Sequence, residues 1–262
     1  MSDSLFLSSS LIKNPHGFST RCGGVSSGIF DSLNLGMNRG DDKALVIENW
    51  NRFLDAVGIK QRDFVCGRQV HGNYVHIASK EDLRPAYGPG ELIDADGYVT
   101  NIPGVPIATF TADCVPLLME DYENKVVASI HCGWRSTVAD IEKEAVDAMV
   151  SLGARKEKIV AAIGPAIGYC CFEVGQEVID AVNQLLSDED TGLYTLKSGE
   201  PGNGKYLLDL RGAVKRRLMQ LGINESNIEI LKDCTMCHPE KYWSHRYTKG
   251  ERGSQANIIT IQ

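Results

Sequence analysis

Hydrophobic and polar residues alternate along the chain with two different periods, which predicts a mixture of strands and helices. Short apolar runs, rich in β-branched residues and bounded by Gly, Pro, Asp or Asn, are typical of buried strands. They predict strands at residues 74–77, 97–100, 107–111, 115–119, 126–130, 159–163, 228–231 and 258–261. Because strands outnumber helices and follow one another in groups, this order favours a mixed α+β fold over a regular doubly wound one.

Apolar residues at helical spacing predict helices between these strands. In the most regular segment, residues 44–57, apolar side chains such as Trp50 recur near a helical period and Gly58 ends the run. The other predicted helices span residues 138–152, 174–186 and 207–221, and the last of them directs its basic residues outward.

Two segments carry turn-forming residues and little periodicity. Residues 15–40 and 188–204 are rich in glycine and polar residues, so we predict that they are loops. The first is too long for a simple connection, and long ordered loops are often binding loops. No linker or internal repeat divides the chain, so we expect one domain over residues 1–262.

Composition and charge restrict the classes of partner. The net charge of −7 argues against a nucleic-acid partner, because phosphate backbones are bound by clustered Lys and Arg. No apolar run approaches the roughly 20 residues of a membrane span, and the N-terminus lacks the basic and apolar regions of a signal peptide. We therefore expect a cytoplasmic protein with no membrane partner, while the oligomeric state stays open.

Candidate chemistry begins with two histidines and a cysteine. His131 follows a predicted buried strand, Cys114 interrupts another apolar run, and His71 lies further upstream. Two His and one Cys with an open fourth position are the ligands of a catalytic zinc centre. The alternatives are a partly buried cysteine with two surface histidines, or a mononuclear copper site with Met119 as weak axial ligand. Six histidines are too few for a full multicopper array.

The remaining cysteines allow several interpretations. In a reducing compartment, eight cysteines indicate buried small side chains, ligands or nucleophiles more than disulfides. Cys234 and Cys237 form a CxxC motif followed by His238, which can hold zinc, form a redox pair or attach haem. Because no second CxxC accompanies it, we interpret these two, and the adjacent pair Cys170 and Cys171, as buried thiols.

Three arginines are candidates for binding an anion. Arg21, Arg135 and Arg246 each lie in a loop-like stretch and not on a solvated helix face. A guanidinium group can bind a phosphate or carboxylate bidentately, although a surface ion pair is the alternative. We predict that these arginines bind substrate.

Taken together, seven motifs resemble those of the laccase-domain family, which is also labelled multicopper polyphenol oxidase and purine nucleoside phosphorylase. In chain order they are TRCGGVS (20–26), SLNLG (32–36), QVHG (69–72), ADG (95–97), TADCVP (111–116), HCGWR (131–135) and GPAIGYCCFEV (164–174). The resemblance implies a single-domain, four-layer α/β/β/α fold with mixed β-sheets. It also implies a metal ion, usually zinc with copper as an alternative, at the positions of His71, Cys114 and His131.

The same resemblance implies an activity. Adenosine, inosine and 5′-methylthioadenosine would react with phosphate to give free base and pentose 1-phosphate, with an accompanying adenosine deaminase activity. In this hypothesis Cys114 and Asp113 are catalytic, Asp113 handles a proton, and Arg21 and Arg135 orient the anion. Because neighbouring residues on a strand point to opposite faces, a role for Asp113 beside Cys114 requires a bulge or turn.

Two departures from the family pattern affect these expectations. The usual HAGWRG reads HCGWRS at residues 131–136, and the usual GRQ near the C-terminus reads GSQ at residues 253–255. If the missing arginine contacts phosphate, Arg252 or Arg246 must replace it.

Three further functions stay open. Bacterial relatives are described as peptidoglycan editing hydrolases that remove L-serine from a UDP-muramyl precursor, where Cys114 would be a nucleophile or a metal ligand. The second is a copper polyphenol oxidase (laccase), and the third is a metal-stabilised binding module.

Overall fold

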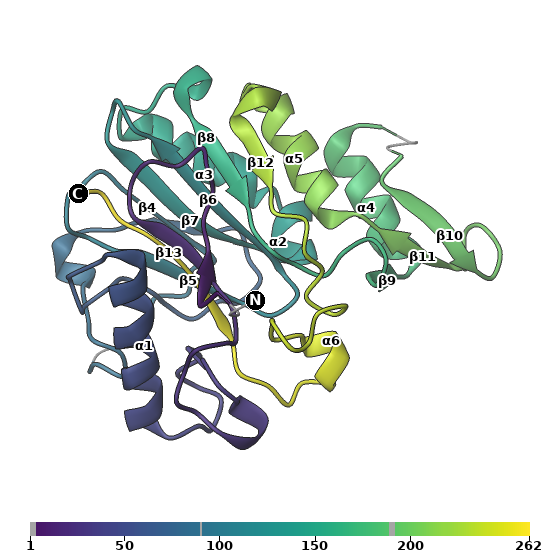
Figure 1. Cartoon of the computed structure of the whole chain (residues 1–262). Coiled ribbons are helices and arrows are strands. Elements are labelled where there is room, and N and C mark those ends of the chain that lie inside the picture. Colours follow the sequence, from purple (N-terminus) through teal and green to yellow (C-terminus); the bar gives the residue numbers. More distant parts are fainter. Residues whose placement is uncertain (1–3, 90, 189–191) are drawn as a thin grey trace.

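Two β-sheets pack face to face in the computed structural model, which describes residues 4–89, 91–188 and 192–262 (Figure 1). The larger mixed sheet has the strand order β12 (Ile228–Ile230), β8 (Val160–Ile163), β6 (Val115–Asp121), β7 (Val126–Cys132), β4 (Gly97–Thr100) and β3 (Val75–Ile77). The smaller antiparallel sheet has the order β1 (Phe6–Leu7), β2 (His16–Ser19), β13 (Gln255–Ile259) and β5 (Ile107–Thr111). A third antiparallel sheet, of β10 (Tyr194–Ser198), β11 (Lys205–Leu208) and β9 (Glu173–Val174), projects at one end.

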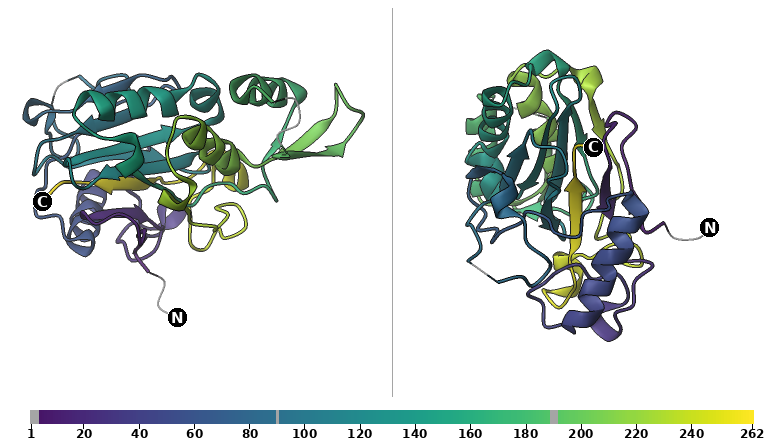
Figure 2. Two further views of the ribbon diagram at one scale, coloured as in Figure 1. Left: turned by 90° about the horizontal axis from the view of Figure 1, so that it is seen from above. Right: turned by 90° about the vertical axis from the view of Figure 1, so that its left-hand side faces the viewer.

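Helices cover the outer faces of the two large sheets. The α-helices of the described residues are α1 (Lys43–Val57), α2 (Trp134–Val138), α3 (Ile141–Ser151), α4 (Gln176–Leu186), α5 (Leu210–Gln220) and α6 (His245–Thr248). Helices α3 and α5 lie on the six-stranded sheet and α1 lies on the four-stranded sheet, on the opposite side of the molecule (Figure 2). The expected four-layer α/β/β/α fold is confirmed. Among the described residues, no helix combines the length and apolar character that crossing a membrane would require.

The central strands are buried on both faces, and this explains their continuous apolar character. Along β7, Ala128 and Ile130 point into the core beneath the helices, whereas Val127 points into the core between the sheets. Ser129 also faces the second sheet, where its hydroxyl lies 3.0 Å from Oγ1 of Thr109. A strand with helices on one side and a sheet on the other therefore needs apolar residues at nearly every position.

Most predicted elements are confirmed, and local signals explain why. The carboxylate of Asp42 accepts a hydrogen bond from the N–H of Ala44 at the start of α1, and Gly58 ends the helix with a φ of 83°. The structure contains all eight predicted strands with boundaries that shift by a few residues. Strands β4 and β5 have the predicted bounds.

Five predicted segments are wrong in part. The predicted helix at 138–152 is divided into α2 and α3 by Asp140, which has a φ of 67° and receives two 2.7 Å hydrogen bonds from Arg217 of α5. The predicted loop at 15–40 contains β2, and that at 188–204 contains β10, although residues 189–191 lie outside the described part. The predicted helices at 174–186 and 207–221 begin later because β9 and β11 pair there. In the last four of these segments, strand pairing overrides the local pattern.

Helix α3 buries a carboxyl group in its first turn. Glu142 is fully buried, and neither of its carboxylate oxygens has a well-oriented hydrogen-bond partner among the described residues. Burial raises the pKa of Glu142 to about 8, because its own backbone amide and the nearby Thr137 hydroxyl compensate only in part.

This pKa predicts a pH-dependent stability. Between the ordinary pKa of 4.5 and about 8, the folded chain holds a proton that the unfolded chain releases, so the free energy of unfolding falls as pH rises. Glu142→Gln is expected to be close to wild type at pH 5 and more stable by on the order of 3 kcal/mol above pH 8. Denaturant unfolding at both pH values measures this difference.

The matched control is Glu144→Gln, which changes an exposed carboxylate on the same helix. It is expected to leave stability unchanged at both pH values. An equal effect of Glu142→Gln at pH 5 and pH 9 would contradict the assigned pKa.

Candidate metal centre and cavity

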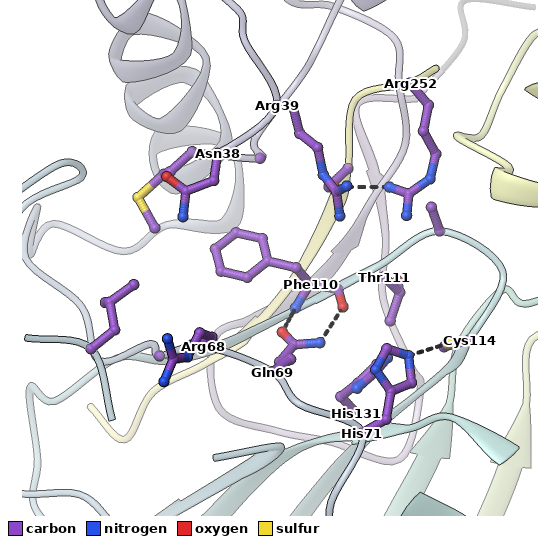
Figure 3. Close-up of a pocket in the computed structure, with 16 residues that line it drawn as sticks. Asn38, Arg39, Arg68, Gln69, His71, Phe110, Thr111, Cys114, His131 and Arg252 are labelled. Atoms are coloured by element: carbon purple, nitrogen blue, oxygen red, sulfur yellow. Dashed lines mark hydrogen bonds between the residues drawn. The ribbon is translucent and has the colours of Figure 1, made fainter. Parts of the chain in front are cut away.

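Three side chains from distant parts of the chain meet beside the end of the six-stranded sheet (Figure 3). His71 precedes β3, Cys114 lies between β5 and β6, and His131 is near the end of β7. Their candidate ligand atoms all lie within 4.8 Å of one another. Sγ of Cys114 is 3.9 Å from Nε2 of His71, and the two imidazole centroids are 4.9 Å apart. The structure thus brings together the three residues predicted as metal ligands.

The three candidate ligands differ in exposure. His131 is only 2% exposed, Cys114 is partly exposed and His71 is exposed. The alternative of two surface histidines is wrong for His131, because β7 is a central strand of the sheet. The cluster therefore has a buried side and an open side.

Asp96 holds two of these ligands in place. Its Oδ1 accepts hydrogen bonds from the N–H of His71 (3.1 Å) and from Nδ1 of His131 (2.8 Å). Its Oδ2 accepts hydrogen bonds from the N–H groups of Val70 (3.0 Å) and Gly72 (2.9 Å). Asp96 thus stabilises the turn in which His71 has a φ of 60°, and it leaves Nε2 of His131 available to a metal ion.

Gly133 leaves room for the cluster where β7 ends and α2 begins. A Cβ at this position would lie 2.9 Å from Cδ2 of His71, 3.5 Å from Sγ of Cys114 and 3.6 Å from Cε1 of His131. A larger residue would therefore displace His71 from the other two side chains. Strand β7 ends at the residue before this glycine and α2 begins at the residue after it.

The electrostatics of the cluster favour a thiolate. Burial raises the pKa of the Cys114 thiol, but His131 and His71 lower it more, and the resulting pKa is about 6. Burial lowers the pKa of His131, whereas the Cys114 thiolate and the Asp96 carboxylate raise it more, to about 9. Since the thiolate is the form that binds metal, Cys114 is suited to be a ligand, and a metal ion would replace the proton on Nε2 of His131.

These donors fit zinc. Two imidazole nitrogens and a thiolate are common zinc ligands, and a tetrahedral ion would place such atoms about 3.3 to 3.6 Å apart. The atoms of His71, Cys114 and His131 can reach this separation through small side-chain movements, because all three already lie within 4.8 Å. Copper also accepts this donor set. However, Met119 is fully buried beneath the helices and does not line the cavity, so the predicted axial ligand is wrong.

Asp113 lies in the turn that the hypothesis requires. Its φ of 89° places it outside regular strand geometry, immediately before Cys114. Its Oδ1 accepts a 2.6 Å hydrogen bond from the Thr235 hydroxyl, and its Oδ2 accepts one of 2.6 Å from the N–H of Arg246. These contacts hold the turn that carries Cys114, and the catalytic role of Asp113 stays a prediction.

A cavity of about 350 Å³ opens onto the metal-ligand cluster. Its wall includes residues 36–39 from the predicted binding loop, residues 67–69, and residues 110–112 at the end of β5. The side-chain amide of Gln69 connects two of these segments, since it donates to the carbonyl of Phe110 and accepts from its N–H, both at 2.7 Å (Figure 3). The candidate ligands therefore face a preformed pocket.

Two arginines in this cavity lack an acidic partner. Arg39 and Arg252 both donate hydrogen bonds to Oγ of Ser254, at 3.3 and 3.1 Å (Figure 3). Within the described part of the chain neither forms an ion pair with a carboxylate, and Nε of Arg252 is buried without a hydrogen-bond partner. Burial lowers the pKa of Arg252 to about 10, with a further contribution from Arg39. Two neighbouring cations of this kind form a site for an anion.

The three arginines predicted from the sequence lie elsewhere. Arg21 donates hydrogen bonds to two backbone carbonyls, and the exposed Arg135 packs over the ring of Trp134. Arg246 donates to the carbonyl of Glu173. None of the three belongs to the wall of the described cavity, and their role in substrate binding stays a prediction.

Sequence reasoning missed Arg39 and Asp96 as site residues. Arg39 lies in the predicted binding loop and Asp96 lies in the ADG motif. These two sequence features mark the segments but do not identify the roles of the individual residues. The GSQ sequence at 253–255 did indicate Arg252 or Arg246 as a substitute, and Arg252 is the one that lines the cavity.

Comparison with known proteins agrees with this architecture. The family model described as multi-copper polyphenol oxidoreductase laccase matches residues 15–262. The chain is 34% identical over 252 residues to purine nucleoside phosphorylase YlmD of Geobacillus stearothermophilus, covering 93% of this chain and 88% of that protein. It is 37% identical over 249 residues to the purine nucleoside phosphorylase of Deinococcus radiodurans, covering 94% and 89%.

A solved structure is also similar to this chain in fold and in sequence. The hypothetical protein YfiH of Bacillus licheniformis superposes with a TM-score of 0.87 and 32% sequence identity, covering 94% of this chain and 92% of that chain. Sequence and fold thus agree over nearly the whole chain. The chain belongs to the laccase-domain family.

Proposed function

We propose that this protein is a zinc-dependent purine nucleoside phosphorylase formed by residues 1–262 as one catalytic domain. The reaction joins a phosphate oxygen to C1′ of adenosine, inosine or 5′-methylthioadenosine, breaks the bond from C1′ to N9, and adds a proton to the leaving base. The observation that carries this proposal is one cavity with a His–Cys–His cluster and two arginines without an acidic partner. The names of the relatives support it.

Phosphate binding is assigned to Arg39 and Arg252. A guanidinium group matches the geometry of phosphate oxygens, and the buried Nε of Arg252 offers an unused donor. Because neither forms an ion pair with a carboxylate within the described residues, these arginines can compensate the charge of the attacking anion.

The nucleoside is assigned to the apolar part of the same cavity. Phe110, Met37 and Leu92 line the wall. An aromatic ring offers a face on which a purine can stack, and aliphatic side chains exclude water from it. Arg68, whose guanidinium is paired with Asp94, stands at the same wall and can contact polar groups of the nucleoside.

The metal is assigned to His71, Cys114 and His131. A zinc ion held by these side chains with one open position would supply Lewis acidity toward a phosphate or water oxygen. Asp96 keeps the His131 ring in the tautomer that leaves Nε2 free.

Asp113 positions Cys114 and is our proposed proton-transfer residue. One of its two hydrogen bonds must open for that step. Adenosine deamination is proposed at the same cavity.

Base release from the three nucleosides, measured with and without phosphate on metal-analysed protein, tests this function. Phosphate-dependent release with stoichiometric pentose 1-phosphate supports it. Release at equal rates without phosphate would indicate a hydrolase instead. No release from any nucleoside, together with serine release from a UDP-muramyl precursor, would favour the peptidoglycan-editing alternative.

Arg39→Ala is expected to raise KM for phosphate by about 10- to 100-fold, because it removes a charge-assisted hydrogen bond to the anion. KM for the nucleoside should change much less. Steady-state kinetics with each substrate varied in turn measures both constants. Arg62→Ala, which changes an exposed arginine paired with Asp55, is the matched control. Equal increases of KM for both substrates in Arg39→Ala would contradict the assignment of phosphate.

A further inference from the structure

Four cysteines from two distant segments converge away from the proposed catalytic cavity. Cys170 and Cys171 precede β9, whereas Cys234 and Cys237 follow β12. Their four sulfur atoms all lie within 4.8 Å of one another. Cys170 and Cys237 are exposed, so the interpretation of these residues as buried thiols is wrong for both. Their shared position indicates a ligand set and not separate packing residues.

The sulfur separations fit metal coordination and exclude disulfides in this structure. Sγ of Cys237 is 3.5 Å from Sγ of Cys170 and 3.4 Å from Sγ of Cys171. A disulfide would require about 2.05 Å. Four thiolates around zinc, at a Zn–S distance of about 2.3 Å, lie about 3.8 Å apart. The two observed distances between sulfur atoms are close to that value.

Backbone contacts fix the two cysteine segments against each other. Ala166 and Cys234 form a parallel bridge, and the N–H of Thr235 donates to the carbonyl of Ala166 at 3.1 Å. The N–H of Gly168 donates to Sγ of Cys234 at 3.1 Å. Amide donors of this kind stabilise a thiolate ligand.

A positive charge lies next to the cluster. A Cβ on Gly168 would be 3.2 Å from Nη2 of Arg211 and 3.3 Å from Sγ of Cys170, so both side chains lie against the same glycine. Arg211 is held there because its Nη1 donates to the carbonyls of Leu231 and Asp233. A zinc ion with four thiolates carries a net negative charge, which this guanidinium can offset.

We propose that Cys170, Cys171, Cys234 and Cys237 bind one structural zinc ion. This site is separate from the catalytic function proposed above and does not depend on it. The sequence alone did not predict this zinc site, because the second pair of cysteines is adjacent and does not form a CxxC motif. The exposed Cys170 and Cys237 give the ion a route of entry.

The four-cysteine site is connected to the turn that carries Cys114. Thr235 lies between the two cysteines of the CxxC motif and donates its hydroxyl hydrogen to Asp113. Asp113 in turn lies directly before Cys114. The zinc ion would therefore fix the segment that supports the turn carrying a catalytic metal ligand.

Metal analysis of protein purified without added metal or chelator tests the proposal. Wild type is expected to contain two zinc ions per chain, and Cys171→Ser and Cys114→Ala one each. The double variant is expected to contain none. Cys22→Ser, which changes a partly exposed cysteine outside both clusters, is the matched control and should retain two.

Cobalt substitution of the Cys114→Ala variant isolates the four-cysteine site. The expected result is the visible spectrum of tetrahedral cobalt with strong thiolate-to-metal charge-transfer bands. A chelator should lower the melting temperature of this variant, because an ion that binds only the folded chain stabilises it. Both measurements are informative even if Cys171→Ser does not fold.

Two outcomes would overturn the four-cysteine site and leave the proposed function intact. One is a single metal ion per wild-type chain that Cys114→Ala loses, with no cobalt spectrum in that variant. The other is a wild-type mass lower by two hydrogens, restored by a reductant, with Cys237 in a disulfide, which would indicate a redox pair.

Discussion

The Cys114→Ala variant is expected to lose the metal ion of the catalytic cavity and to slow phosphorolysis by at least about 10³-fold. Cys114 supplies the thiolate of the three-ligand set, and two histidines alone hold zinc weakly. Loss of several kcal/mol of charge stabilisation at the transition state corresponds to a decrease of this size. Metal content and phosphate-dependent base release, measured on the same preparation, determine the effect.

The same variant tests whether one centre serves both reactions. Adenosine deamination should disappear together with phosphorolysis, because both are assigned to the same cavity. Cys22→Ser should retain both activities. If phosphorolysis persists in metal-free Cys114→Ala, the proposed role of zinc in that reaction is wrong.

Asp96→Asn is expected to weaken metal binding by about 10- to 100-fold and to lower the free energy of unfolding by about 2 to 4 kcal/mol. Asp96 accepts four hydrogen bonds, including those from His131 and from the N–H of His71. An asparagine side chain has one oxygen, and its amide N–H₂ would face donors that then lack an acceptor. Competition with a chromogenic chelator measures metal affinity, and denaturant unfolding measures stability.

Asp94→Asn is the matched control for this variant. Asp94 lies two residues earlier, but its carboxylate is exposed and paired with Arg68. An exposed ion pair contributes little to stability, so the change is expected to stay below about 1 kcal/mol. Equal metal affinity in Asp96→Asn and wild type would show that Asp96 does not position His131.

Local signals account for the elements that were predicted correctly. Helix α1 has a capping aspartate, an apolar stripe and a terminal glycine within its own sequence, so its bounds need no distant information. Strands β4 and β5 are short apolar runs between turn formers. By contrast, β2 and β10 lie in polar or glycine-rich segments, and only pairing with β13 and β11 makes them strands.

Among the site residues, too, some were predicted from the sequence and others were identified only in the structure. His71, Cys114 and His131 were identified because their residue types restrict the chemistry and because their motifs resemble those of a family. Arg39 has no such signature, since an arginine in a loop is ordinary until the structure places it beside Arg252 without an acidic partner. The role of Asp96 depends on four donors that come from two separate segments.

The sequence by itself determined the class of fold, the family and the three candidate metal ligands, because periodicity, turn residues, motifs and ligand types are local properties. Only the tertiary structure decided which arginines share the cavity with these ligands. It alone brought the cysteine pair at 170–171 to the CxxC motif at 234–237. The physical reason is that such neighbours are set by long-range strand pairing and by the packing of two sheets, which no local pattern of residues encodes.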